Sequence, residues 1–166
     1  MINLQGKTPN ILVIGDLMLD CYLWGSCNRI SPEAPVQIVN IDSESTVLGG
    51  AGNVINNLKS LGSKVDIISV IGECQSSKEL ISLLNQINIG TNFLVQQKDR
   101  ITSKKSRIVA EKQQVVRYDI ENTDDISNDS QNAIISIFKK IVRNYDLVPV
   151  SYTHLRAHET LMNLVC

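Results

Sequence analysis

The sequence predicts an α/β fold, in which a parallel sheet carries helices on its faces and a small antiparallel sheet projects beside it. Short apolar runs that end in glycine alternate with helical patterns along the chain, and such runs are typical of buried parallel strands. Two further segments alternate apolar and polar residues, which is typical of antiparallel strands with one covered face. The 166 residues are enough for one domain with its own core.

Short apolar runs are expected to form the parallel sheet, and helical patterns separate them. The strands are expected at residues 10–15, 64–72 and 91–96, with a further strand beginning at 146–148. The first helix follows GGAGN and ends at Gly62, because glycine favours a helix end. The second has the capping-box spacing Ser76-x-x-Glu79, and the third begins at Ser127 and runs to about Tyr145. Alternation of this kind predicts parallel strands joined by helices.

Two segments break the alternation of strands and helices. Residues 36–42 (VQIVNID) and 106–120 (SRIVAEKQQVVRYDI) alternate apolar and polar side chains, and no helical pattern follows them directly. We expect these segments to form the separate antiparallel sheet.

Composition and charge argue against several functions. The chain has 16 basic and 17 acidic residues, whereas a general nucleic-acid binder would carry a basic excess. No apolar run reaches the roughly 18–20 residues of a membrane span, and the polar start is unlike a signal peptide. The four cysteines (residues 21, 27, 74 and 166) form no CxxC motif and are expected to be reduced thiols. The sequence therefore predicts a cytoplasmic protein that binds neither nucleic acid nor membrane.

A glycine-rich segment, LGGAGN at residues 48–53, precedes the first helix. Gly49 and Gly50 allow the backbone to approach a ligand closely, and the helix start offers N–H groups to an oxygen-rich ligand. Asn53 can both donate and accept hydrogen bonds, which suits a polyol hydroxyl. A tight turn with no ligand is the alternative interpretation, and no GxGxxG or P-loop motif accompanies the segment.

Two carboxylates follow the first strand in GDLMLD, residues 15–20. Ligands of open α/β sheets bind beyond the carboxyl ends of the strands. Asp16 and Asp20 are therefore placed where a carboxylate can accept hydrogen bonds from hydroxyls. A turn-forming role is the alternative for each of them.

These motifs resemble those of a known family. GGAGNVINNLKSLGSKVDIISVIG resembles the N-terminal signature of the ribokinase-like (phosphofructokinase-B) carbohydrate kinases, although Ile55 stands where a small residue is usual. GDLMLDCYLWGSCNRISPEAPV and TSKKSRIVAEKQQVVRYD resemble segments of the heptose-7-phosphate kinases of lipopolysaccharide-core synthesis, and RISPEAPV is specific to that group. These kinases often form one half of a bifunctional kinase and adenylyltransferase. The resemblance runs from about residue 11 to residue 148.

The resemblance implies the N-terminal part of a ribokinase-like three-layer αβα sheet, with a small antiparallel lid at about residues 17–42 and 100–120. Asp20 would bind sugar hydroxyls together with the glycine pair and Asn53, and basic lid residues would face the phosphate of the substrate. For the lid residues, solvated strand positions are the alternative. The substrate-binding residues implied are Asp20, Gly49, Gly50, Asn53, Lys105, Arg107, Gln114 and Arg117.

The function implied is phosphorylation of D-glycero-D-manno-heptose 7-phosphate at its anomeric hydroxyl with ATP and Mg²⁺, by a homodimer joined through the lid. The catalytic aspartate of the family lies in a late GAGD motif, which this sequence lacks. We therefore expect no catalytic residue, no metal site, little of the ATP site and no activity in this chain by itself. Two alternatives are a kinase acting on a fructose- or ribose-type sugar, and a non-catalytic sugar-binding or dimerising fragment.

The native kinase segment is expected to be residues 1–149, followed by a non-native tail at 150–166. VSYTHLRAHET, residues 150–160, reads as the translation of a transposase sequencing adapter. His154 and His158 have the i, i+4 spacing of zinc ligands on a helix, with Glu159 beside them. The adapter accounts for the same residues without a metal and is the interpretation we favour.

Overall fold

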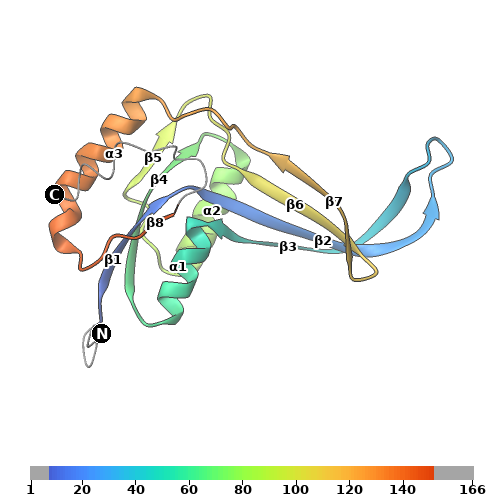
Figure 1. The fold of residues 1–166 in the computed structure, drawn as a ribbon, viewed down its shortest axis with the longest axis horizontal. Coiled ribbons are helices and arrows are strands. Elements are labelled where there is room, and N and C mark those ends of the chain that lie inside the picture. Colours follow the sequence, from blue (N-terminus) through green and yellow to red (C-terminus); the bar gives the residue numbers. More distant parts are fainter. Residues whose placement is uncertain (1–7, 152–166) are drawn as a thin grey trace.

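The computed structural model describes residues 8–151 and has the α/β architecture expected from the sequence (Figure 1). In chain order the elements are β1 (Asn10–Gly15), β2 (Leu17–Ile30), β3 (Gln37–Gly50), α1 (Ala51–Ser60), β4 (Lys64–Gly72), α2 (Gln75–Gln86), β5 (Leu94–Gln97), β6 (Lys104–Ala110), β7 (Gln113–Ile120), α3 (Asn128–Ile141), the 3-10 helix η1 (Val142–Asn144) and β8 (Val150–Ser151). These strands form two sheets, a parallel one and a lid that projects from it.

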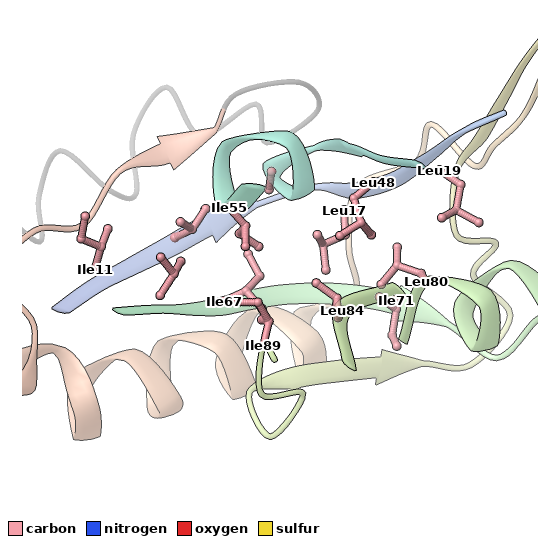
Figure 2. Packing of buried hydrophobic residues seen from close by; sticks show 13 residues of the cluster. Ile11, Leu17, Leu19, Leu48, Ile55, Ile67, Ile71, Leu80, Leu84 and Ile89 are labelled. Atoms are coloured by element: carbon pink, nitrogen blue, oxygen red, sulfur yellow. The ribbon is translucent and has the colours of Figure 1, made fainter. Parts of the chain in front are cut away.

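The parallel sheet has the strand order β5-β4-β1-β8, and its pairings are all parallel. Successive residues of β1 point to opposite faces. Ile11 and Val13 pack with Ile55 of α1 and Leu84 of α2, whereas the alternate residues of β1 pack with Phe138 of α3. Figure 2 shows Ile11, Ile55 and Leu84 in the first of these clusters. Helices therefore cover both faces, which confirms the three layers predicted from the sequence.

The end of the described chain joins the same sheet. Leu12 N donates to Leu147 O at 3.0 Å, and β8 continues this parallel pairing along β1. The strand expected from residue 146 thus begins later, at Val150, and residues 146–148 contribute only an isolated parallel bridge between Leu147 and Ile11. Val150 and Ser151, the first residues of the expected tail, belong to β8. The histidine pair at 154 and 158 lies outside the described residues.

The lid consists of β2, β3, β6 and β7 in the order β3-β2-β6-β7. Two of its pairings are antiparallel, as expected, but β2 and β6 are parallel, so the sheet is mixed. Both of these strands leave the parallel sheet in the same direction, and Leu19 N donates to Ser103 O at 2.9 Å where they start side by side. In addition, β3 continues past residue 42 and meets α1 at Gly50.

The capping box expected at the start of α2 does not form. The helix begins at Gln75 with Cys74 at its N-cap, and no side chain caps it. Glu79 accepts instead from Lys104 Nζ of the lid at 3.3 Å, so a tertiary contact replaces the local one. The third helix starts where expected, because Ser127 is the N-cap of α3 and its hydroxyl accepts from Ser130 N at 3.2 Å. The α-helix ends at Ile141, and η1 continues it to Asn144, one residue short of Tyr145.

The helices of the described chain are amphipathic rather than continuously apolar. Between residues 8 and 151 the structure has no helix with the length and hydrophobicity that a membrane span requires.

Candidate functional site

The candidate site lies where the lid leaves the carboxyl edge of the parallel sheet. The chain passes from β1 through Asp16 directly into β2, and it returns along β3 to Gly50, where α1 starts. Ala51 N donates to Asp16 O at 2.9 Å and closes this junction. Met18 is paired with Gly49 in the antiparallel register. The two motifs singled out in the sequence, GDLMLD and LGGAGN, are therefore side by side.

Both glycines are required by close contacts at this junction. A Cβ at Gly49 would overlap Oδ2 of Asp20 and would lie 2.9 Å from Cγ of Met18. Gly50 has a φ of 57°, and a Cβ there would lie 2.5 Å from the Asp16 carbonyl oxygen. Left-handed backbone of this kind favours glycine. The glycine pair thus brings the chain against the Asp20 carboxylate, in addition to forming a turn.

The Asp20 carboxylate is held by an arginine from the neighbouring lid strand. Arg107 Nη1 donates to Asp20 Oδ1 at 2.6 Å, and both side chains are 21% exposed. The Arg107 guanidinium lies over the Tyr22 ring, 5.3 Å from its centroid. Tyr22 in turn stacks on Trp24, with ring centroids 5.9 Å apart. Asp20, Tyr22 and Trp24 share one lid face because they are two residues apart on β2.

The other two basic candidates on this face are already paired with carboxylates. Lys105 Nζ lies 3.3 Å from Asp119 Oδ2 and 2.9 Å from Glu121 Oε2. Arg117 donates to both oxygens of Asp119, from Nε at 2.9 Å and from Nη2 at 2.6 Å. The hydrogen bonds from Arg117, and to a lesser extent the one from Lys105, place the pKa of the Asp119 carboxyl far below its ordinary value. The row of charges on the lid is therefore balanced between basic and acidic side chains.

The remaining candidates lie at the margins of this cluster. Asn53 is exposed in the first turn of α1, directly after the glycine pair. Gln114 is exposed near the distal end of the lid. In the strand register it lies level with Trp24, because Val109 of β6 pairs with both residues. Trp24 lies four residues beyond Asp20, or about 13 Å along a strand. The structure thus brings Asp20, Gly49, Gly50 and Arg107 together and leaves Gln114 apart.

Sequence reasoning missed the aromatic pair and the acidic partners of the lid cations. The pattern of residues 17–30 does not mark them as one long strand and so does not single out Tyr22, although Asp20 and Tyr22 have the spacing of a shared strand face. Asp119 and Glu121 are separated from Lys105 by a hairpin. Their pairing depends on strand register, which the local sequence pattern does not specify.

A hollow adjoins this cluster at the carboxyl ends of β1 and β4. Thr102 holds its rim, since its hydroxyl accepts from Gly72 N at 2.9 Å and lies 2.8 Å from the Ser77 hydroxyl. In the part of the chain that is described, no group of three or more Asp, Glu, His or Cys side chains gathers to hold a metal ion. The residues lining the hollow are Asp16, Leu17, Val70, Arg100, Ile101, Thr102, Ser103 and Asn122.

Helices cover both faces of the parallel sheet, and the lid leaves its carboxyl edge where the Asp20 carboxylate lies beside the glycine pair. The model of the pfkB family of carbohydrate kinases matches residues 8–158, and the chain belongs to this family. It is 59% identical to the bifunctional protein HldE of Aliarcobacter butzleri over 145 residues, and this matched segment covers 87% of this chain and 30% of that protein. HldE of Sulfurimonas denitrificans is 53% identical over 148 residues, or 89% of this chain and 31% of that protein. The chain therefore spans less than a third of the length of these relatives.

Solved structures agree on the fold. A carbohydrate kinase from Agrobacterium tumefaciens superposes with a TM-score of 0.62 and 18% identity, covering 86% of this chain and 45% of that one. The ribokinase of Arabidopsis thaliana, solved with ribose and ATP, superposes with a TM-score of 0.56 and 15% identity, covering 87% and 45%. These similarities establish the ribokinase-like fold.

Proposed function

We propose that the full-length protein carrying this chain phosphorylates D-glycero-D-manno-heptose 7-phosphate at its anomeric hydroxyl, using ATP and Mg²⁺, in the synthesis of ADP-heptose for lipopolysaccharide. The observation that carries the proposal is the Asp20 carboxylate, fixed between Gly49 and Arg107 at the base of the lid. Support for the substrate class comes from the 59% and 53% identity to two HldE proteins.

The chemistry of the cluster suits a phosphorylated sugar. A carboxylate accepts hydrogen bonds from hydroxyls, and a glycine pair lets the sugar approach the backbone. Asn53 would donate to or accept from a further hydroxyl. Arg107 would bind the phosphate through guanidinium N–H groups other than the one that it donates to Asp20, since guanidinium groups form strong charge-assisted hydrogen bonds with phosphate oxygens. Lys105 and Arg117 would reach the phosphate only by giving up their carboxylate partners, and Gln114 only through lid movement.

The proposal assigns residues 1–149 to the sugar-binding half of the kinase and residues 150–166 to a non-native tail. ATP and Mg²⁺ supply the phosphoryl group and balance its charge in kinases. The GAGD motif that carries the catalytic aspartate of the family does not occur in this sequence. We accordingly assign the phosphoryl-transfer step to other parts of the full-length protein and expect residues 1–149 to be inactive by themselves.

A coupled kinase assay on the full-length protein tests this function. It compares D-glycero-D-manno-heptose 7-phosphate, fructose 6-phosphate and ribose as acceptors at equal concentrations. We expect turnover with the heptose phosphate to exceed that with either other sugar. Faster turnover of fructose 6-phosphate or ribose would identify a different sugar kinase, and turnover of none of them would favour a non-catalytic sugar-binding protein.

We also propose that two copies of the protein associate through their lids. The ribbon of β2 and β3 continues beyond the last pairing of β2 with β6, at Gly25 and Ala110 (Figure 1). Exposed apolar side chains lie on this ribbon and in the loop that joins its strands, which is typical of a surface that pairs with a partner: Trp24, Ile30 and Ile41 on the strands and Val36 in the loop. Light scattering would detect the dimer. We expect Ile30→Asp with Ile41→Asp to give a monomer, and a wild-type monomer would contradict the proposal.

A further inference from the structure

The two oxygens of the Asp20 carboxylate have different surroundings. Oδ1 accepts a hydrogen bond from Arg107 Nη1 at 2.6 Å. Oδ2 lies against Gly49, where any Cβ would overlap it. One oxygen is thus held by a cation of the lid, while the other is directed toward the glycine pair.

The arginine that holds Asp20 is itself held by an aromatic ring. Tyr22 and Arg107 are register partners in the parallel pairing of β2 and β6. The Arg107 guanidinium carbon lies 5.3 Å from the centroid of the Tyr22 ring, within the range of a cation–π interaction. The Tyr22 ring stacks on Trp24 with an angle of 16° between the ring planes. Both neighbours therefore restrict the position of the Tyr22 ring.

We propose that Tyr22 is a positioning residue of the sugar site, which acts through Arg107 on Asp20. The inference rests on the proposed function, because it assumes that Asp20 accepts from a sugar hydroxyl. The Tyr22 ring keeps the guanidinium on Oδ1, and Oδ2 then stays turned toward Gly49 to accept from the hydroxyl. Without the ring, the long arginine side chain samples other rotamers, and the carboxylate must be ordered when the sugar binds.

This role depends on the face of the ring and not on the phenolic hydroxyl. Phenylalanine offers the same aromatic face to a guanidinium, whereas leucine fills space without one. Tyr22→Phe should therefore keep the site ordered, and Tyr22→Leu should disorder it. Tyr118 provides a matched control for loss of a lid tyrosine. It is exposed, and it lies on the opposite face of the lid from its neighbour Arg117.

The test measures steady-state kinetics of the full-length protein with heptose 7-phosphate at saturating Mg-ATP. We expect Tyr22→Leu to raise KM about 5-fold with little change in kcat, the magnitude of a half-buried cation–π contact. Tyr22→Phe and Tyr118→Leu should stay within about twofold of wild type. Because Tyr22 acts through Arg107, adding Tyr22→Leu to Arg107→Gln should raise KM no further.

Crystal structures without sugar provide a measurement that is independent of turnover. We expect Arg107 to contact Asp20 in wild type and Tyr22→Phe, and to leave it in Tyr22→Leu. If Arg107 stays on Asp20 in Tyr22→Leu, the positioning role is wrong, whether or not the protein phosphorylates any sugar. Equal KM values for Tyr22→Leu and wild type would also overturn it while leaving the proposed function intact. If wild type turns over none of the sugars, the proposed function fails together with the hydroxyl role of Oδ2.

Discussion

Substituting Gly49 with alanine tests the close packing of the glycine pair against Asp20. The new Cβ would overlap Asp20 Oδ2, and it would lie 2.9 Å from Cγ of Met18 and 3.0 Å from Cγ of Asp20. Ordinary contacts between carbon atoms are about 3.5–4.0 Å, so these atoms must retreat by roughly 0.5–1 Å. If the carboxylate retreats away from Arg107, the Asp20–Arg107 hydrogen bond of 2.6 Å would lengthen to roughly 3.1–3.6 Å, which is at or beyond the usual limit of about 3.2 Å.

The expected cost has two parts. Overpacking of this kind lowers the free energy of unfolding by about 1–3 kcal/mol. Alanine offsets roughly 0.4–1 kcal/mol of this loss, because it reduces the conformational entropy of the unfolded chain. Loss of a charge-assisted hydrogen bond costs about 1.5–3 kcal/mol. If that cost falls on the bound state, affinity for heptose 7-phosphate weakens at least 10-fold.

Isothermal titration calorimetry on the full-length protein measures this affinity, and thermal unfolding measures the stability. Gly90→Ala is the control, since its Cβ would have only Asp66 Oδ1 nearby, at 3.8 Å. We expect Gly90→Ala to bind the sugar phosphate as wild type does. A Gly49→Ala protein with wild-type affinity would refute the assignment of the glycine pair and Asp20 to one sugar site.

Three further predictions concern the core, the lid and acid stability. Leu84 is fully buried, so Leu84→Ala should lower the free energy of unfolding by about 2–5 kcal/mol, whereas the exposed Leu61 should tolerate alanine. Equal losses for the two variants in denaturant unfolding would contradict the placement of Leu84 in the core. Lys104→Met removes the contact of the lid with Glu79 of α2. We expect the free energy of unfolding to fall by about 0.5–1 kcal/mol and the amide hydrogens of β6 to exchange faster, and unchanged exchange would be evidence against this link. Because the pKa of Asp119 is lowered by Arg117 and Lys105, its contribution to stability is complete above the unfolded pKa of about 4 and is lost as pH falls below it. Asp119→Asn should flatten this part of the pH–stability curve, and an unchanged curve would disprove the contribution.

The main layer was predictable because its pattern is local. β1 and β4 are runs of apolar residues, and both faces of these strands are buried. A strand with no polar face must have helices on both sides, and the helical patterns between the strands supply them. Family motifs and the rule that ligands bind at the carboxyl ends of strands also assigned Asp20 and Gly49 to one expected sugar site, and the structure brings the two residues into contact.

The lid was only partly predictable because its strands pair over long sequence separations. The parallel pairing of β2 with β6 joins Asp20 to Lys105, and nothing in the alternation of either strand distinguishes it from an antiparallel one. The same register decides that Arg107 meets Asp20 and that Lys105 meets Asp119. At α2 the helix begins at Gln75, so Glu79 lies beyond the N3 position that a capping box requires and pairs with Lys104 of the lid instead.

The affinity of one conservative variant, Asp20→Asn, decides whether Asp20 is the carboxylate that binds the sugar. Asp20→Asn keeps the size of the side chain but removes the charge that holds Arg107 at 2.6 Å. Calorimetric titration of the full-length protein with D-glycero-D-manno-heptose 7-phosphate should show affinity at least 10-fold weaker than wild type. Wild-type affinity in Asp20→Asn would contradict the account.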